Sequence, residues 1–431
     1  MSKKQLLVLI VVVLITSSLA GAVTLEIWQA SSNEQLAIMK SFIEERFTPK
    51  TGISVNLSVI PGGDDQWNKV LLAMASNDTP DLAVIGSEWP LEFGIRGGLV
   101  DMREMFGEEY DKLFATAFPG LNESLTYYNT GFGLNSSFGQ TLTYYRTDIF
   151  AENGWEVPAT WDEARALLPK MQARDMNIGS GSWYLTPDWF GAYIFMWQHG
   201  IREVNEERTR TTWDTPEAIA AFTEFMELFT VHGIPLESVP FIEAISRGDY
   251  PFIVGISWGY SDITLGAPQL KGKWDICLIP GKKQPDGTIN HAAYIGGNPY
   301  VMFKNSKHKE EAFEFLKWWL SAEVQREFAD MVWNKLQIIY QPANMEAYNS
   351  VTFLPESHRR ILNIQAEQSR APLFALGLVV SRRNLTNAAR AVVLTGADPK
   401  AELLKAAEIS NDELARKQKE YARFIKGLIQ E

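Results

Sequence analysis

The stretch Leu142–Met171, LTYYRTDIFAENGWEVPATWDEARALLPKM, decides how the fold of this chain is interpreted. It opens with an apolar segment, Leu142 to Tyr145, that predicts a short strand, and Asn153-Gly154 then supplies a turn that tolerates positive φ. Thr160 and Glu163 have the spacing of a capping box, in which a hydroxyl oxygen and a carboxylate satisfy the first free amides of a helix. The residues alone therefore predict a strand, a turn and a strongly started helix.

The same stretch resembles a segment of the extracellular solute-binding proteins of bacterial ABC importers, the family that includes maltose-binding proteins. Members of that family carry "YNxDxF", "xxGL" and "PxTWDEL" in this order, and the chain has TYYRTDIF, ENGW and VPATWDEA. Arg146 stands where the family usually has Asn. The resemblance implies that this segment leaves one lobe of a two-lobed protein, passes a hinge and begins the other lobe.

Further segments extend the resemblance over nearly all of the chain after its first residues. In chain order they are Thr79–Met102, Ile253–Ile263, Trp274–Pro280, Ala293–Ala329 and Val392–Ala407. None of them is a catalytic motif, and the family is indicated by their order and spacing. The resemblance implies an α/β fold of two doubly wound lobes joined by crossing hinge strands, as in type II-like periplasmic binding proteins.

The first part of the mature chain supports this fold class from its residues. Apolar patterns predict strands at Thr24–Trp28, Ile53–Val59 and Asp81–Ile85, separated by helices at Asn33–Phe47 and Trp67–Ala75. An alternating β-α-β-α-β order indicates a parallel, doubly wound sheet. In such sheets ligands bind at the loops beyond the carboxyl ends of the strands.

The domain organisation follows from length and from the resemblance. A chain of 431 residues is expected to build at least two cores. The resemblance assigns residues 23–139 plus 291–336 to an N-terminal lobe and residues 140–290 plus 337–431 to a C-terminal lobe. It also places a third crossing of the hinge at Leu336–Pro342.

Residues 1–22 have the three parts of a secretory signal. Lys3 and Lys4 precede the apolar run Leu6–Ile15, and Ala20-Gly21-Ala22 offers a cleavage site of small residues. An uncleaved N-terminal anchor is the alternative, although the run is short for a membrane span. No cysteine follows the leader to carry a lipid. We therefore expect a mature protein that is periplasmic and does not span a membrane.

Charge and cysteine content exclude several classes of function. The formal net charge of −12 repels phosphate backbones and anionic membranes, which makes nucleic acid an unsuitable partner. Cys277 is the only cysteine, so an internal disulfide is impossible. It lies in an apolar run, where a side chain that fills the core is expected rather than a reactive thiol.

The sequence contains no catalytic or metal-binding arrangement that we can defend. No GxSxG or HExxH motif occurs, and adjacent acids such as Asp64-Asp65 are sequence neighbours rather than carboxylates facing one another across a site. The histidines are far apart and lack zinc-ligand spacing: His199, His232, His291, His308 and His358. We therefore expect no enzyme activity, metal or cofactor.

Tryptophans in loops indicate the class of ligand. The chain has 14 tryptophans, and Trp89, Trp183, Trp189 and Trp258 are flanked by Gly, Ser, Asp or Pro. An indole can cover the apolar C–H face of a sugar ring while polar side chains bond its hydroxyl rim. Filling of the two cores is the alternative role for each of these residues.

The loops beyond the carboxyl ends of the predicted strands are Gln29–Glu34, Pro61–Asp65 and Gly86–Leu91. The resemblance adds polar candidates in these loops and elsewhere in the chain. The complete set of predicted ligand-binding residues is Ser32, Asn33, Asp65, Glu88, Trp89, Gln140, Trp183, Trp189, Trp258, Tyr260, Tyr294, Asn298 and Arg383.

These observations lead to one functional hypothesis and two alternatives. We expect a monomeric periplasmic protein that captures a sugar, an oligosaccharide above all, between two lobes and delivers it to the permease of an ABC importer. The same fold could instead bind glycerol phosphate or another anion through Arg202 or Arg383. A secreted carbohydrate-active enzyme would need two carboxylates placed across one site. A receptor-coupled signalling role also stays open.

Overall fold

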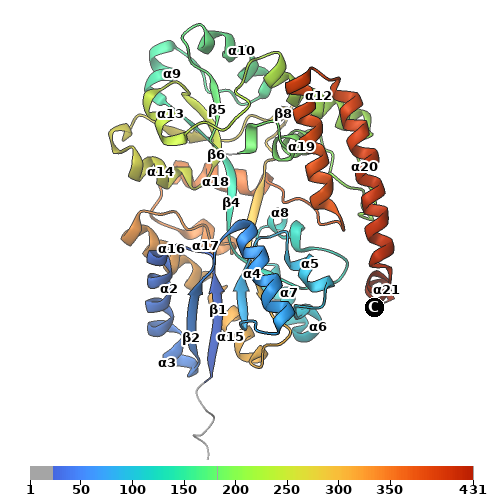
Figure 1. The fold of residues 1–431 in the computed structure, drawn as a ribbon. Coiled ribbons are helices and arrows are strands. Elements are labelled where there is room, and N and C mark those ends of the chain that lie inside the picture. Colours follow the sequence, from blue (N-terminus) through green and yellow to red (C-terminus); the bar gives the residue numbers. More distant parts are fainter. Residues whose placement is uncertain (1–22, 182, 431) are drawn as a thin grey trace, which may run out of the picture. The chain divides into compact units, whose positions relative to one another are not determined.

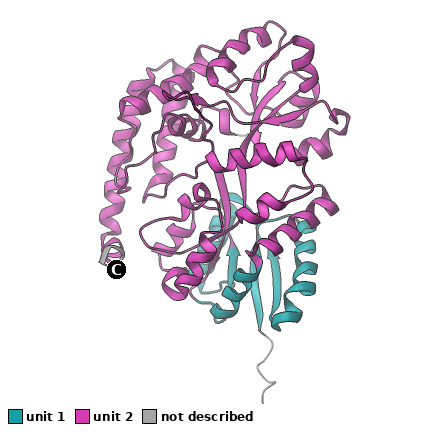
Figure 2. Ribbon diagram, turned by 180° about the vertical axis from the view of Figure 1, so that it is seen from behind, with its two compact units in different colours: residues 1–83, 305–318 teal, residues 84–304, 319–431 magenta. Residues whose placement is uncertain are grey.

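The computed structural model describes residues 23–181 and 183–430, so the predicted signal peptide lies outside the described residues. The chain divides into two compact units (Figure 2). Unit 1 contains the residues up to Ala83 together with Asn305–Trp318, and unit 2 contains Val84–Lys304 together with the chain from Trp319 onward. This division differs from the predicted lobe boundaries, which stay a prediction.

Unit 1 is built on three parallel strands. β1 (Thr24–Gln29) pairs with β2 (Ser54–Val59) on one side and with β3 (Leu82–Val84) on the other. The predicted β-α-β-α-β order is therefore confirmed. The helices of this part are α2 (Asn33–Arg46), α3 (Thr48–Thr51), α4 (Gly63–Ser76) and most of α15 (Lys309–Trp319) (Figure 1).

The sheet of unit 2 is mixed and centres on one long strand, β4 (Leu134–Tyr145). The first half of β4 pairs antiparallel with β10 (Ile295–Met302), and its second half pairs antiparallel with β6 (Phe252–Ile256) and β7 (Asp275–Cys277). β5 (Ile178–Ser180) adds to β6 in parallel. Two sets of strands that are distant in sequence are thus joined by β4.

The segment after β4 differs from the prediction at one point. The capping box forms as expected, because Thr160 Oγ1 accepts from the Glu163 amide at 3.2 Å and starts α10 (Trp161–Gln172). A short helix, α9 (Thr147–Asn153), precedes the turn and was not predicted. Its first turn carries Asp148, whose carboxylate accepts from the buried Arg146 side chain at 2.7 Å, and this ion pair fixes the start of α9.

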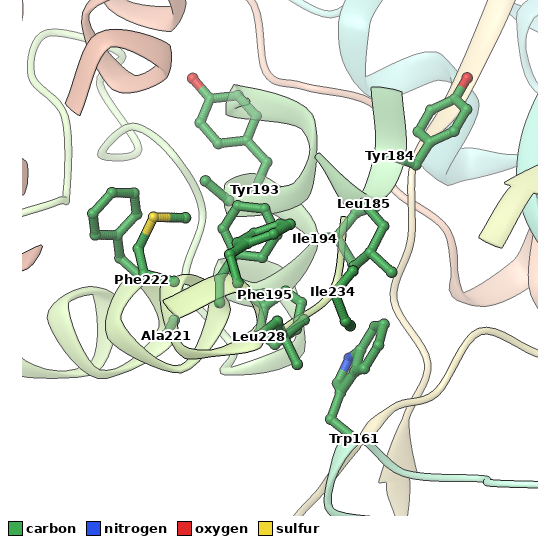
Figure 3. Packing of buried hydrophobic residues seen from close by; sticks show 14 of the residues in the cluster. Trp161, Tyr184, Leu185, Tyr193, Ile194, Phe195, Ala221, Phe222, Leu228 and Ile234 are labelled. Carbon is green, nitrogen blue, oxygen red and sulfur yellow. The ribbon is translucent and has the colours of Figure 1, made fainter. Parts of the chain in front are cut away.

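The core of unit 2 is rich in aromatic side chains (Figure 3). It forms around α11 (Trp189–Gln198) and α12 (Pro216–Thr230), and Phe222 and Phe225 of α12 are fully buried in it. Trp161 stacks on Phe195 at 4.9 Å between ring centroids. Cys277 packs against this core, and burial raises the pKa of its thiol, as expected for a side chain that is not reactive.

The remaining elements of unit 2 are mostly helices, together with the short strands β8 and β9. In chain order they are α5 (Pro90–Ile95), α6 (Met102–Phe106), α7 (Glu108–Phe114), α8 (Pro119–Asn122), η1 (Glu123–Leu125), η2 (Trp183–Leu185), α13 (Phe241–Arg247), α14 (Gly259–Gly266), η3 (Pro268–Leu270), β8 (Lys282–Lys283), β9 (Ile289–Asn290), α16 (Ala322–Leu336), α17 (Met345–Ser350), α18 (Glu356–Gln368), α19 (Leu378–Thr395), α20 (Pro399–Glu420) and α21 (Ala422–Gln430).

The segment that follows α16 is extended but does not form a strand. Phe138 donates its amide to the Gln341 carbonyl at 3.1 Å, and Pro342 makes an isolated bridge with Ser137. Proline has no amide hydrogen, so a longer ladder is interrupted here. Among the described helices, none is both long enough and apolar enough to cross a membrane.

Candidate functional site

The floor of the candidate site is a pair of glycines on neighbouring strands of unit 2. Gly139 of β4 lies directly opposite Gly296 of β10. A Cβ on Gly139 would lie 3.2 Å from Trp258 Cζ2, and a Cβ on Gly296 would lie 2.5 Å from Tyr294 Oη. Directly opposed residues of antiparallel strands point to the same face of a sheet. The Trp258 and Tyr294 rings therefore occupy one face, where the two glycines leave room for them.

Polar side chains continue the same face along the two strands. Asn298 lies opposite Ser137, two residues from the glycine pair on each strand, and its Nδ2 donates to Ser137 Oγ at 3.2 Å. Alternation along a strand places these side chains on the side of Trp258 and Tyr294. The register shifts after Asn298, which ends the regular pairing there. Three of the predicted residues are thus brought together beside the glycines.

An ion pair supports the next part of the site. Glu88, in the loop after β3, pairs with Arg382 of α19, whose side chain is only 7 % exposed. The Arg382 guanidinium carbon lies 4.3 Å from the centroid of the Trp189 indole. Trp189 in turn lies 6.4 Å from Tyr294, measured between ring centroids. Burial raises the pKa of Tyr294, and the neighbouring Glu88 charge acts in the same direction. Glu88 and Trp189 are therefore connected to the glycine floor through Tyr294.

The local sequence explains why Trp189 stands where it does. Asp188 caps α11 by accepting from the Phe190 amide at 3.3 Å, so Trp189 becomes the first residue of the helix. The Phe190 ring lies 3.7 Å from the Trp189 ring, and Trp183 stacks on Phe190 at 6.4 Å. Trp189 is half-buried by these contacts and by Arg382.

Trp183 and Trp258 are the exposed indoles of this region, with 64 % and 51 % of their surface accessible. Trp183 follows β5 and Trp258 follows β6, and these two strands pair in parallel. The carboxyl ends of parallel strands lie at one edge of the sheet. Both indoles consequently emerge from the same edge and present ring surface to solvent.

Four other predicted residues of unit 2 have different surroundings. Gln140 is fully buried, and its Nε2 donates to Tyr348 Oη and to the Leu362 carbonyl, each at 3.0 Å. Tyr260 is buried in α14 and bonds His358 Nδ1 at 2.8 Å. Arg383 is exposed on α19, whereas its neighbour Arg382 points inward. Trp89 is half-buried over Gly86 at the start of α5.

Three predicted residues belong to unit 1. Ser32 caps α2, where its Oγ accepts from the Gln35 amide at 3.2 Å, and Asn33 is the first residue of that helix. Asp65 was expected in a loop, but α4 begins at Gly63, so Asp65 lies exposed in the first turn of a helix. The earlier start follows from Gly62, whose extended backbone is suited to the cap position.

The family is decided by comparison with known proteins. The family model described as "Bacterial extracellular solute-binding protein" matches residues 29–326 of this chain. The chain belongs to this family.

Similar proteins agree with the assignment of this solute-binding protein. The Brucella abortus binding protein BAB2_0491 is 25 % identical over 323 residues, which cover 71 % of this chain and 75 % of that protein. The diacetylchitobiose binding protein DasA of Streptomyces coelicolor is 22 % identical over 288 residues, covering 64 % of each chain. The sugar-binding protein MalE of Xanthomonas citri shares the fold, with a TM-score of 0.78, 19 % identity and coverage of 93 % and 99 %.

Sequence reasoning missed parts of the site of this solute-binding protein. Gly139 was not selected, although a glycine inside a strand is a signal for close approach of another group.

Two arginines of this solute-binding protein, Arg382 and Arg202, already have carboxylate partners. Arg382 is matched by Glu88, and Arg202 is matched by Glu123 at 2.8 Å and by Glu203 at 3.3 Å. Among the residues that the structure describes, no group of three His, Cys, Asp or Glu side chains could hold a metal ion. The site thus offers ring surfaces, an amide and hydroxyls, and its one buried guanidinium is already neutralised.

Proposed function

We propose that this protein is the periplasmic solute-binding component of an ABC importer and that it captures a sugar, in particular an oligosaccharide. The observation that carries the proposal is the pair of exposed indoles, Trp183 and Trp258, at one edge of the sheet. Two ring platforms suit a ligand with more than one sugar ring. The names of DasA and MalE, which refer to diacetylchitobiose and to sugar, support the same ligand class.

The chemistry of the site supports a neutral polyhydroxylated ligand. Aromatic faces stack on the C–H face of a sugar, while the Asn298 amide and the Glu88 carboxylate can bond hydroxyls, the latter strongly because it is charged. An anionic ligand such as glycerol phosphate would need an available cation. Arg382 and Arg202 already hold carboxylate partners, and Arg383 is exposed on α19, where its charge lies near Glu413 of α20. The sugar is therefore the better fit.

The proposed mechanism is a population shift between open and closed forms. A ligand that touches both predicted lobes only in the closed form favours that form by its differential affinity. The closed form then docks on the permease of the importer. An exported monomer, released from the leader of residues 1–22, is the species that we propose performs this delivery.

The test is a thermal-shift and calorimetry screen against neutral oligosaccharides and against glycerol phosphate. A sugar present at about 100 times its Kd should add about 2.7 kcal/mol to the free energy of unfolding. Binding should also change the tryptophan fluorescence, because Trp183 and Trp258 lose solvent contact. Stabilisation by the anion with none by any sugar would overturn the proposal.

Two variants locate the binding surface. Trp183→Ala and Trp258→Ala should each weaken binding of the stabilising sugar about tenfold, since loss of a stacking contact costs about 1 kcal/mol or more. Leu394→Ala is the matched control, because Leu394 is an exposed apolar residue on α19. If all three variants bind equally well, the ligand does not use the indoles.

A further inference from the structure

A groove in unit 2 lies beside α5 and α6 and is lined in part by a side chain of the C-terminal helix. Its volume is about 760 Å³. Ile95 of α5, Met105 of α6 and Phe132 contribute to its walls, and Phe424 of α21 lines it as well. One wall of the groove thus comes from a segment that is more than 280 residues away from α5, α6 and Phe132 in the sequence.

The beginning of α20 is firmly anchored at a different place. Asp398 caps the helix by accepting from the Ala401 amide at 2.8 Å. Leu403, Ala406 and Ala407 are buried in the aromatic core of unit 2. α20 packs there against α12 and α19 (Figure 1). This end of the helix therefore belongs to the core.

The middle of α20 is held by side-chain contacts to the loop after α11. Asn411 Oδ1 accepts from the Thr211 amide at 2.8 Å and from its hydroxyl at 3.1 Å. Leu414 is fully buried against Val204 and Leu378. Gln418 Nε2 reaches the Arg208 carbonyl at 3.3 Å. The helix is thus fixed along most of its length.

The far end of this segment is held lightly. Glu420 lies close enough to Arg96, at the end of α5, for their charges to attract. In α21, Ala422 and Arg423 are exposed, and Phe424 is only half-buried in the groove. A helix end with few buried apolar contacts opens more easily than the core to which it is attached.

We propose that the groove beside α5 and α6 is the docking surface of the chain's own C-terminal helix, α21, and that α20 and α21 together form a strap. The strap fastens α5 and α6 to the core around α12 and α19. Its occupant is identified by Phe424 of α21, which lines the groove together with residues of α5 and α6. Glu420, the last residue of α20, adds an attraction to Arg96.

The consequence for ligand capture depends on the proposed function. By the predicted lobe boundaries, α5 and α6 belong to the N-terminal lobe and α12 and α19 to the C-terminal lobe. A strap between them resists opening, and it raises the apparent sugar affinity by increasing the closed fraction. Docking of α21 itself needs no ligand, so it can be tested separately.

The test measures hydrogen exchange in the full-length protein without any sugar. Phe424→Asp introduces a negative charge at the groove from α21. Met105→Asp introduces one from α6, at a residue that is exposed. Both variants should speed exchange about tenfold in α5, α6 and α21, while exchange around α12 stays as in the original protein. Small-angle scattering should show a larger radius of gyration for both.

Ile409→Asp is the matched control, because Ile409 is an exposed apolar residue on α20 outside the groove. It should leave exchange in α5 and α6 unchanged. The proposal is overturned if the groove variants speed exchange in α21 alone, or if Ile409→Asp speeds exchange in α5 and α6 equally. The exchange experiment uses no sugar, so its outcome does not depend on the result of the sugar screen. The strap and the proposed function can therefore fail independently.

Discussion

The opposed glycines Gly139 and Gly296 leave room for aromatic rings above strands β4 and β10. A side chain at either position would meet an aromatic ring at 3.2 Å or less. The glycines thus act by what they lack, and the rings of Trp258 and Tyr294 take the space above them. This dependence makes the glycines sensitive positions for binding.

Gly139→Ala should weaken sugar binding about tenfold with little loss of stability. The new Cβ would lie 3.0 Å from Ile256 Cδ1 and 3.2 Å from Trp258 Cζ2, so the exposed indole must move. Titration calorimetry with the stabilising sugar measures the effect. Gly62→Ala is the control, since a Cβ there meets nothing within 4 Å. Unchanged affinity in Gly139→Ala would show that the indole position does not matter.

Arg382→Met should destabilise the protein by about 3 kcal/mol, because it leaves Glu88 without its buried partner. It should also weaken sugar binding, since both Glu88 and Trp189 lose the group that positions them. Urea unfolding and calorimetry measure the two effects.

Arg382→Lys is the informative control for this position. An ammonium can pair with a carboxylate but does not reproduce the planar contact of a guanidinium with an indole. We expect its stability to recover in part while binding stays weak. Full recovery of binding in Arg382→Lys would contradict a positioning role for the contact with Trp189.

At this scale the sequence was a partial guide. Trp258 and Trp183 were selected because they stand next to glycine or serine, and both indoles are exposed in the structure. The sequence could not show which of the adjacent Arg382 and Arg383 points into the protein. Adjacent residues of a helix point in different directions, and the packing of α19 buries Arg382 and exposes Arg383.

At the scale of elements, helix starts were the most predictable features. Thr160 accepts a hydrogen bond from the third residue of the helix that it was expected to cap, and Thr215 and Asp398 cap α12 and α20 in the same way. These contacts are local, so a short stretch of sequence determines them. α9 escaped notice because its start depends on Arg146, a residue whose role is set by the more distant Ile245 carbonyl as well as by Asp148.

Thr160→Ala should lower the free energy of unfolding by about 1 kcal/mol, the usual effect of losing a helix cap. Thr160 accepts from the Glu163 amide, and Glu163 reciprocates at 3.1 Å. Chemical denaturation followed by circular dichroism measures the change. Thr230→Ala, at the exposed end of α12, should have a smaller effect. Equal losses in the two variants would argue against the capping box as the cause.

At the scale of the whole molecule, the parallel order of β1, β2 and β3 followed from sequence because connections between parallel strands obey simple rules. The meeting of Glu88 with Arg382 did not follow, since those residues come from distant parts of the chain. The sequence around Glu88 or Arg382 contains no pattern that predicts their pairing. The lobe boundaries remain a prediction.

Stability should fall at acid pH through one ion cluster that joins several elements. Glu224 of α12 accepts from Arg165 at 2.9 Å, His199 at 2.8 Å and Lys282 at 2.7 Å. Burial opposes ionisation, but these hydrogen bonds lower the pKa of Glu224 to about 2. A depressed pKa contributes stability above the unfolded value of 4.5, and this contribution disappears as the pH falls from about 5 to 2.

Glu224→Gln tests this origin of the acid sensitivity. The original protein should lose on the order of 3 kcal/mol between pH 5 and pH 2 through this group. The variant should be less stable at pH 7 and should show a shallower decline in acid. Urea unfolding at several pH values measures both slopes. Parallel pH profiles for the two proteins would rule out Glu224 as the source.

The single buried thiol of Cys277 has a practical consequence. Because its pKa is raised by burial and no second cysteine exists, maleimide dyes should leave the folded chain unlabelled. A cysteine placed at the exposed Leu265, on the helix that follows Trp258, would then be the one reactive position. A dye attached there could report ligand capture by its emission, turning the protein into an optical sensor for whichever solute it carries.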